Sequence, residues 1–231
     1  MGFFKDMIAV FQKKELKFLE YRKEADDVYS FMFEKPNDLS WNAGQYGLFT
    51  ITHKSIKNNT RPLSIASAPE ENVIRITTRI SDSPSDYKKA LLELKQGMTI
   101  KMGGPIGKFS LDDSSPSLLI AGGIGITPFR SILKQVAGGG NSARPIHLLY
   151  MDRHLFKDEL DAMAEQGVLT VTYVSSRDAL EQEIDQFAAQ HKTSGNYYVA
   201  GPKSLVDSIS SYMNKHNVPK QRVKKDAFFG Y

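Results

Sequence analysis

The chain contains no cysteine among its 231 residues. This absence excludes disulfide bonds, thiolate catalysis and cysteine-held iron–sulfur clusters within the chain. The sequence also lacks any run close to the roughly 18 apolar residues that a membrane-spanning helix needs. The N-terminal segment MGFFKDMIAVFQKK does not resemble a secretory signal, because Lys5 and Asp6 interrupt its apolar run. The expected location is therefore cytoplasmic.

The sequence also lacks a metal-binding pattern and has only a small net charge. The five histidines are scattered without metal-ligand spacing, so no metal site is predicted. A formal net charge of +4 weakly favours anionic partners and is too small to indicate nucleic-acid binding. The hydrophobic fraction of 41% and the charged fraction of 24% are those of an ordinary globular protein.

Two hydrophobic periodicities divide the chain. Residues 1–14 predict a short amphipathic helix that packs on the body of the protein or, alternatively, contacts a membrane or a partner. Residues 15–113 contain several β-rich segments and one helix near 84–94, which predicts a small antiparallel β-barrel domain. From 114 to 231, short apolar strands alternate with helices. This pattern predicts an α/β domain whose parallel sheet is covered on both faces.

A glycine-rich turn follows the first predicted parallel strand, in the sequence AGGIGITPFRSIL over residues 121–133. Gly122, Gly123 and Gly125 allow a tight turn and a close approach of a ligand to the backbone. Thr127 is a good helix N-cap, and Pro128 suits the first helical position. The spacing differs from G-x-G-x-x-G, and a turn without a ligand is the alternative. The helix N-terminus after this strand favours a bound pyrophosphate.

Two segments of the barrel half are candidates for a second phosphate-bearing ligand. In RPLSIAS, Arg61 has the fork geometry for a phosphate, and Ser64 is placed to hydrogen-bond a ligand ring. Pro62 keeps this segment extended, and the alternative is an edge strand with a surface arginine. In SDSPSDYKK, Asp82 or Ser83 is the expected helix cap, Pro84 the first helical residue, and Ser85 a further donor. An ordinary capped helix is the alternative reading of that second segment.

In this order, the segments resemble the ferredoxin–NADP reductase superfamily over nearly the whole chain beyond residue 15. The resemblance implies a barrel that binds FAD, or alternatively FMN, followed by a domain that binds NADPH or NADH. Residues 103–109, GGPIGKF, are similar to the turn that closes the flavin domain. The resemblance implies flavin contacts at Arg61, Pro62, Leu63, Ser64, Ser83 and Ser85. It implies contacts with the pyrophosphate of the nicotinamide dinucleotide at Gly122, Gly123, Gly125, Thr127 and Pro128. It also implies nicotinamide contacts at Gly201 and Pro202, and a terminal aromatic over the flavin at Phe229 or Tyr231.

The sequence departs from the family pattern at three places. Leu63 replaces the aromatic residue that usually packs against the isoalloxazine, which leaves FAD and FMN both open. Ala200 replaces the usual cysteine beside the hydride path. Ser176 and Arg177 match a pair that grips the 2′-phosphate in NADP-using relatives, whereas the lysine and tyrosine that usually follow are absent. The pair favours NADPH slightly over NADH.

The resemblance implies an oxidoreductase that passes a hydride from the nicotinamide dinucleotide to the flavin, with Ser64 and Tyr231 next to the reacting atoms. The electron acceptor is then a separate partner, such as a ferredoxin or flavodoxin, or another subunit. One alternative is a flavin or ferric reductase with small-molecule acceptors. Another is a non-catalytic electron-transfer subunit. The basic residues Lys220, Arg222, Lys224 and Lys225 suggest a site for an acidic carrier or, equally, a solvated face.

Overall fold

The structure, a computed structural model, describes residues 12–111, 114–139, 144–191 and 194–228. The chain divides into two compact units, Met1–Ser110 and Leu111–Tyr231, here called unit 1 and unit 2. Most of the predicted N-terminal helix lies outside the described residues, and Lys14 already begins the first strand. Among the described residues, the helices are too short or too polar to cross a membrane.

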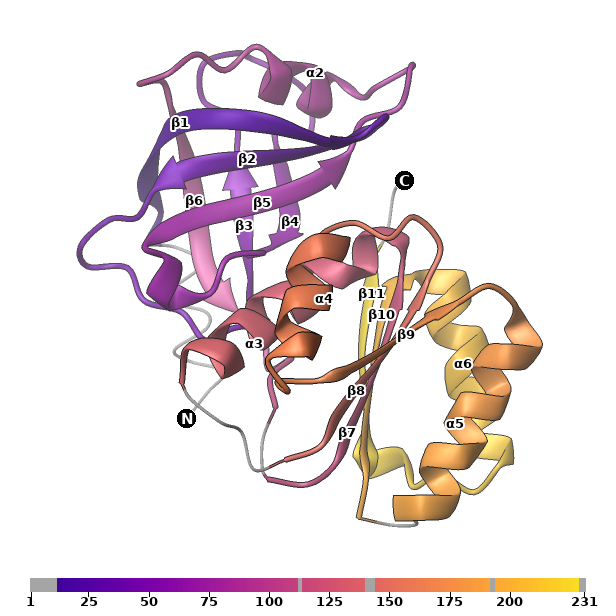
Figure 1. Cartoon of the computed structure of the whole chain (residues 1–231). Helices are drawn as coiled ribbons and strands as arrows, with labels where there is room; N and C mark the ends of the chain where they lie inside the picture. Colours follow the sequence, from indigo (N-terminus) through magenta and orange to yellow (C-terminus); the bar gives the residue numbers. More distant parts are fainter. Residues whose placement is uncertain (1–11, 112–113, 140–143, 192–193, 229–231) are drawn as a thin grey trace. The chain divides into compact units, whose positions relative to one another are not determined.

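Unit 1 is a curved antiparallel sheet of six strands in the order β4-β3-β6-β1-β2-β5 (Figure 1). Just beyond one edge strand, the N–H of Ala66 donates to the carbonyl of Arg75 in the other edge strand at 2.7 Å, which helps to close the barrel. The predicted antiparallel barrel is confirmed. Its elements are β1 Lys14–Ala25, β2 Val28–Glu34, β3 Tyr46–Thr50, β4 Thr60–Ser64, η1 Pro69–Glu71, β5 Val73–Arg79, α2 Asp86–Leu92 and β6 Thr99–Ile106.

Aromatic side chains fill the barrel of unit 1. Phe31, Phe33 and Phe49 are fully buried, and the ring of Phe18 meets that of Phe33 edge to face with centroids 5.6 Å apart. Each such side chain contributes about 1.5–3 kcal/mol by leaving water. The alternation of these residues along the strands specifies the register, because a slip of one residue would expose them. The barrel is therefore a firm support for β4 and α2.

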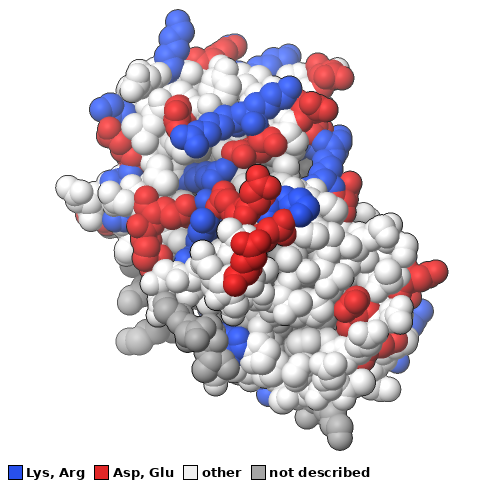
Figure 2. Space-filling view, in the orientation of Figure 1, with Lys and Arg blue, Asp and Glu red and all other residues white. Residues whose placement is uncertain are grey.

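The surface of unit 1 mixes both signs of charge. On the face drawn in Figure 2, its Lys and Arg side chains are interspersed with Asp and Glu. Lys17 on β1 pairs with Glu34 on the neighbouring strand β2 at 3.2 Å, and Arg75 on β5 pairs with Glu24 on β1 at 2.6 Å. The exposed pair of Lys17 and Glu34 adds about 0–1 kcal/mol. This face is thus not a surface of one charge sign.

Unit 2 is a parallel sheet of five strands in the order β11-β10-β7-β8-β9. Helices α3 and α4 cover one face, and α5 and α6 cover the other (Figure 1), which confirms the predicted α/β architecture. The run SLLIAG is buried at every residue, as a strand covered on both faces requires. The elements are β7 Ser117–Gly122, η2 Gly123–Gly125, α3 Ile126–Gly138, β8 Ile146–Met151, α4 Lys157–Glu165, β9 Thr170–Val174, α5 Arg177–His191, β10 Asn196–Pro202, α6 Lys203–Lys215, η3 Lys220–Arg222 and β11 Val223–Phe228.

Strand β11 was missed by the sequence analysis, which interpreted this region only as a run of cations. The strand pairs in parallel with β10, with Lys224 opposite Tyr198. Its lysines are tolerated because β11 is an edge strand with one side open. Arg222 donates to Asn196 Oδ1 at 3.0 Å, and Lys224 Nζ lies 5.4 Å from the Tyr198 ring centroid. At least these two cations of the run are engaged with β10.

Candidate functional site

The glycine turn of unit 2 leads directly from β7 into α3. The 3₁₀ turn Gly123–Gly125 comes first, and α3 then begins at Ile126 with Gly125 at the N-cap. The expectation that Thr127 caps the helix and Pro128 opens it is wrong. The 3₁₀ turn advances the helix start, so Thr127 lies in the first turn and its hydroxyl donates to the Ile124 carbonyl at 3.0 Å. The N-terminal N–H groups suited to an anion therefore belong to the glycine turn itself.

Packing inside unit 2 explains two of the three glycines. A Cβ at Gly125 would lie 2.1 Å from the carbonyl oxygen of Ala200, and a Cβ at Gly122 would lie 2.2 Å from Leu205 Cδ2. Gly123 instead has a φ of +51°, and a Cβ there would meet only Asp152 Oδ2, at 3.6 Å. The protein thus needs Gly125 even without a ligand, because backbone atoms of β10 block a Cβ there, whereas a Cβ at Gly122 would require only the end of the Leu205 side chain to move.

Tyr150, near the end of β8, contacts the backbone of the glycine turn through its hydroxyl. Its buried hydroxyl lies 3.1 Å from the Gly123 carbonyl oxygen and 3.0 Å from that of Arg153, and it accepts the N–H of Leu155 at 3.0 Å. Burial raises the pKa of this hydroxyl, so it stays protonated and able to donate. Sequence reasoning missed Tyr150, although a tyrosine closing an apolar strand signals a polar tip in need of a partner.

The carboxyl end of β10 meets the same turn. Gly201 has a φ of +151°, and a Cβ there would lie 3.1 Å from the Gly122 carbonyl oxygen. Pro202 follows as the N-cap of α6. The structure therefore brings Gly201 and Pro202 together with Gly122 and Gly125 at one edge of the sheet, where ligands of parallel sheets bind.

Asp226 is a further residue near this edge that sequence reasoning missed. It lies on β11 opposite Ala200 and is partly buried. Burial raises the pKa of its carboxyl from 3.8 to about 6. The sequence did not indicate the position of Asp226, because the strand β11 that carries it was not predicted. The expected terminal aromatics Phe229 and Tyr231 lie outside the described residues.

Ser176 and Arg177 lie at the carboxyl end of β9, where α5 begins. The Ser176 hydroxyl accepts the N–H of Ala179 at 3.2 Å and so caps the helix. Arg177 Nε donates to Glu181 at 2.5 Å, and Nη1 donates to Ser208 Oγ on α6 at 2.8 Å. Both members of the expected pair are thus hydrogen-bonded within unit 2.

In unit 1, the expected flavin segment Arg61 to Ser64 forms most of the edge strand β4. Arg61 Nη1 donates to the carbonyls of Asn58 at 2.8 Å and Thr60 at 2.9 Å. Pro62 is exposed, Ser64 is half-buried, and Leu63 packs against the core cluster of the barrel. A proline on an edge strand sacrifices no ladder hydrogen bond.

Helix α2 brings more positive charge to Arg61. The guanidinium of Arg61 lies 5.5 Å from the ring centroid of Tyr87 on this helix. Burial lowers the pKa of Lys88, and the guanidinium groups of Arg79 and Arg61 lower it further. Arg79 also pairs with Asp27 at 2.5 Å. Two arginines close enough to lower the pKa of Lys88 concentrate positive charge here, which favours a bound anion, and sequence reasoning had named only Arg61.

The start of α2 differs from the expectation. Ser85 is the N-cap, with its hydroxyl accepting the Lys88 N–H at 3.4 Å, and the helix begins at Asp86. The prediction that Asp82 or Ser83 caps the helix and Pro84 opens it is wrong. Ser85 takes the cap because its backbone is extended and its hydroxyl reaches the first turn.

Comparison with known proteins places this geometry in a family context. Residues 119–211 match the family described as oxidoreductase NAD-binding domain. A flavohemoprotein of Rhodopirellula baltica is 26% identical over 90% of the chain, which spans 58% of that relative. The ferredoxin reductase component of a 3-ketosteroid-9-alpha-monooxygenase of Rhodococcus rhodochrous is 27% identical over 89% of the chain, which spans 62% of that relative. The chain is thus shorter than both.

Solved structures resemble the chain across both units. The ferredoxin–NADP+ reductase of Plasmodium falciparum has a TM-score of 0.79 at 19% identity, covering 95% of this chain and 97% of that one. The flavohem-like FAD/NAD binding domain of a Vibrio cholerae nitric oxide dioxygenase has a TM-score of 0.73 at 21% identity, covering 93% and 98%. These two solved structures share the two-unit fold of this chain. The chain thus has the fold that the sequence resemblance predicted, and the family match at residues 119–211 lies within its second unit.

Proposed function

We propose that the chain is an FAD-dependent NAD(P)H oxidoreductase that passes a hydride from NAD(P)H to bound FAD and electrons onward to a separate acceptor. The observation that carries the proposal is the glycine turn Gly122–Gly125 at the carboxyl end of β7, inside the segment that matches the oxidoreductase NAD-binding domain family. The second support is the fold shared with a ferredoxin–NADP+ reductase over 95% of the chain and with an FAD/NAD binding domain over 93% of it.

The residues of unit 1 fit a flavin with a phosphate-bearing tail. Arg61, Arg79 and Lys88 supply concentrated positive charge beside the start of α2, which suits a pyrophosphate. Ser64 offers a half-buried hydroxyl on β4, at the far end of the same strand segment from Arg61. When bound, the flavin supplies the ability to take up a hydride and release electrons singly or in pairs.

The residues of unit 2 hold and orient the nicotinamide dinucleotide. The N–H groups of the glycine turn bind the pyrophosphate, and Tyr150 fixes the turn through the Gly123 carbonyl. Gly201 and Pro202 end β10 next to the glycine turn, and the nicotinamide lies against them in this proposal. Hydride transfer depends on positioning more than on an acid or base, so a rigid turn is the main catalytic contribution of this unit.

The acceptor is a separate carrier protein or partner subunit in this proposal. Two relatives are named as parts of larger systems, the 3-ketosteroid-9-alpha-monooxygenase reductase component and the toluate 1,2-dioxygenase electron transfer component of Pseudomonas putida. The chain spans 62% and 57% of these proteins. It holds no cysteine for an iron–sulfur cluster of its own, which supports an acceptor outside the chain.

The test is flavin binding followed by rapid-mixing reduction. The purified chain, reconstituted with FAD or FMN, should show a bound flavin spectrum that NADPH or NADH bleaches under anaerobic conditions. Arg61→Ala should weaken FAD binding by about tenfold or more, since a charged hydrogen bond to phosphate is worth about 1.5–3 kcal/mol. Arg22→Ala is the matched control, because Arg22 is exposed on β1 and pairs with Glu20. A native chain that binds neither flavin would refute the proposal.

A further inference from the structure

The position of the adenosine end of the dinucleotide follows from the strand order of unit 2. The glycine turn ends the central strand β7, with β10 on one side and β8 and then β9 on the other. In the proposed function the nicotinamide lies at the end of β10, so the adenosine extends toward β8 and β9. Neighbouring strands lie about 4.8 Å apart, which puts the end of β9 roughly 10 Å from the turn, within reach of the adenosine ribose. Groups at the end of β9 therefore face the ribose 2′ position.

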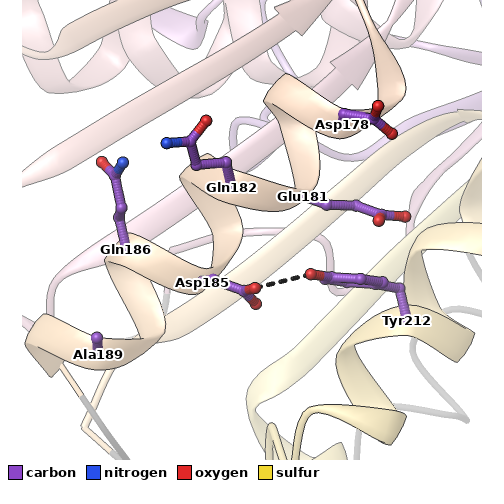
Figure 3. Close-up of a pocket in the computed structure, with 7 residues that line it drawn as sticks. All are labelled: Asp178, Glu181, Gln182, Asp185, Gln186, Ala189 and Tyr212. Carbon is purple, nitrogen blue, oxygen red and sulfur yellow. Dashed lines mark hydrogen bonds between the residues drawn. The ribbon is translucent and has the colours of Figure 1, made fainter.

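The cation at the end of β9 is Arg177, and its charge is already neutralised by Glu181. Arg177 Nε donates to Glu181 Oε1 at 2.5 Å, and Nη1 and Nη2 donate to Ser208 Oγ at 2.8 Å and to its carbonyl oxygen at 3.5 Å. Its guanidinium also lies 5.8 Å from the Tyr212 ring centroid. These contacts hold Arg177 against α6, and Figure 3 shows the Glu181 carboxylate pointing toward the helix that carries Tyr212.

The other groups at the end of β9 disfavour the 2′-phosphate that distinguishes NADPH from NADH. The hydroxyl of Ser176 is used as the cap of α5. Asp178 adds a carboxylate to the first turn of α5, and the Glu181 carboxylate is paired with Arg177 (Figure 3). A 2′-phosphate brings a charge of about −1.5 to −2 to this place. A ribose 2′-hydroxyl is instead a donor that a carboxylate accepts, as in NAD-binding folds.

From this arrangement we infer that the chain selects NADH over NADPH, with Glu181 as the specificity-determining residue that withholds Arg177 from a 2′-phosphate. The inference rests on the proposed function, since it names the donor for the same dinucleotide site. It reverses the slight preference for NADPH that the Ser176-Arg177 pair suggests in the sequence, because the hydroxyl and the guanidinium already make hydrogen bonds to α5 and α6.

Calorimetric titration with adenosine phosphates tests the inference without any flavin reaction. 5′-ADP and 2′,5′-ADP differ only in the 2′-phosphate, and each reports on the adenosine half of the site. We expect 5′-ADP to bind about tenfold more tightly or better, since a single like charge a few ångströms away is worth about that factor. Flavin reduction should show the same preference in kcat/KM for NADH over NADPH.

Variants assign the preference to Glu181. Glu181→Gln should remove the charge that neutralises Arg177, while the bonds to Ser208 remain, and shrink the ratio of the two affinities by about three- to tenfold. Glu165→Gln, which removes an exposed carboxylate at the far end of α4, should leave the ratio unchanged. A ratio that Glu181→Gln does not change would overturn the role given to Glu181.

Two other outcomes count against the inference in different ways. Tighter binding of 2′,5′-ADP by the native chain would overturn it, and loss of that binding in Arg153→Ala or Arg177→Ala would show which arginine takes the phosphate. Arg153 is included because it is exposed in the loop that follows β8. If neither nucleotide binds, the dinucleotide site itself fails, and the proposed function fails with it.

Discussion

Replacing Asp226 with asparagine should stabilise unit 2 at neutral pH and leave its stability nearly unchanged at about pH 4. Burial raises the pKa of the Asp226 carboxyl in the folded chain from 3.8 to about 6. As the pH rises above about 4, the unfolded chain releases this proton first, so unfolding becomes easier until the pH passes the folded value. Asparagine has the same shape and never ionises, and it removes this loss.

The size of the effect follows from the two pKa values. A difference between 3.8 and about 6 corresponds to at most about 3 kcal/mol at 1.36 kcal/mol per pH unit. The stability difference between Asp226→Asn and the native chain should therefore rise from near zero at about pH 4 to this plateau above about pH 6. Partial exposure of the carboxyl to water makes the figure an upper bound.

Urea unfolding at several pH values measures the difference, and the chain offers separate probes for its two units. Far-ultraviolet circular dichroism follows mainly unit 2, which contains the long helices α3, α5 and α6. The single tryptophan, Trp41, is buried in unit 1 and supplies an internal reference by fluorescence.

Asp207→Asn on α6 is the matched control, since Asp207 is an exposed carboxylate paired with Lys203 and is worth about 0–1 kcal/mol. Its effect should show no comparable rise across this pH range. A stability difference for Asp226→Asn that is the same at every pH, or a variant less stable than the native chain at pH 7, would refute the reasoning.

Two further predictions concern the glycine turn. Tyr150→Phe removes the hydroxyl that contacts the Gly123 carbonyl, and it should cost about 1–3 kcal/mol of stability, measured by urea unfolding. The same variant should raise KM for the nicotinamide donor in steady-state kinetics. An unchanged KM would show that the turn keeps its shape without this hydroxyl. Gly125→Ala places a Cβ 2.1 Å from the Ala200 carbonyl oxygen and should destabilise unit 2 by about 1–3 kcal/mol or more. Gly138→Ala, where the Cβ meets nothing within 4 Å, should be neutral or stabilising by up to about 1 kcal/mol, and equal losses in both variants would contradict the packing argument.

Local signals in the sequence were enough to determine the two-unit architecture. Strand alternation in the first half and strand–helix alternation in the second depend on side-chain spacing along a single element, so they survive without tertiary information. The glycine turn at the end of β7 was found for the same reason, as was Arg61 on β4. Helix starts were misplaced by two residues or more, since caps depend on which hydroxyl actually reaches the first turn.

Only the tertiary structure decided which side chains act together. Tyr150 reaches the glycine turn across 27 residues of sequence, and Arg177 is held by Ser208 from 31 residues away. Arg79 and Lys88 join Arg61 because α2 packs against the core of the barrel. Such contacts have no period and no fixed spacing, because packing between elements makes them. The sequence by itself predicted the glycine turn and the Arg61 segment as candidate sites for a dinucleotide and a flavin, and the folded chain decided which charges and hydrogen bonds surround each segment.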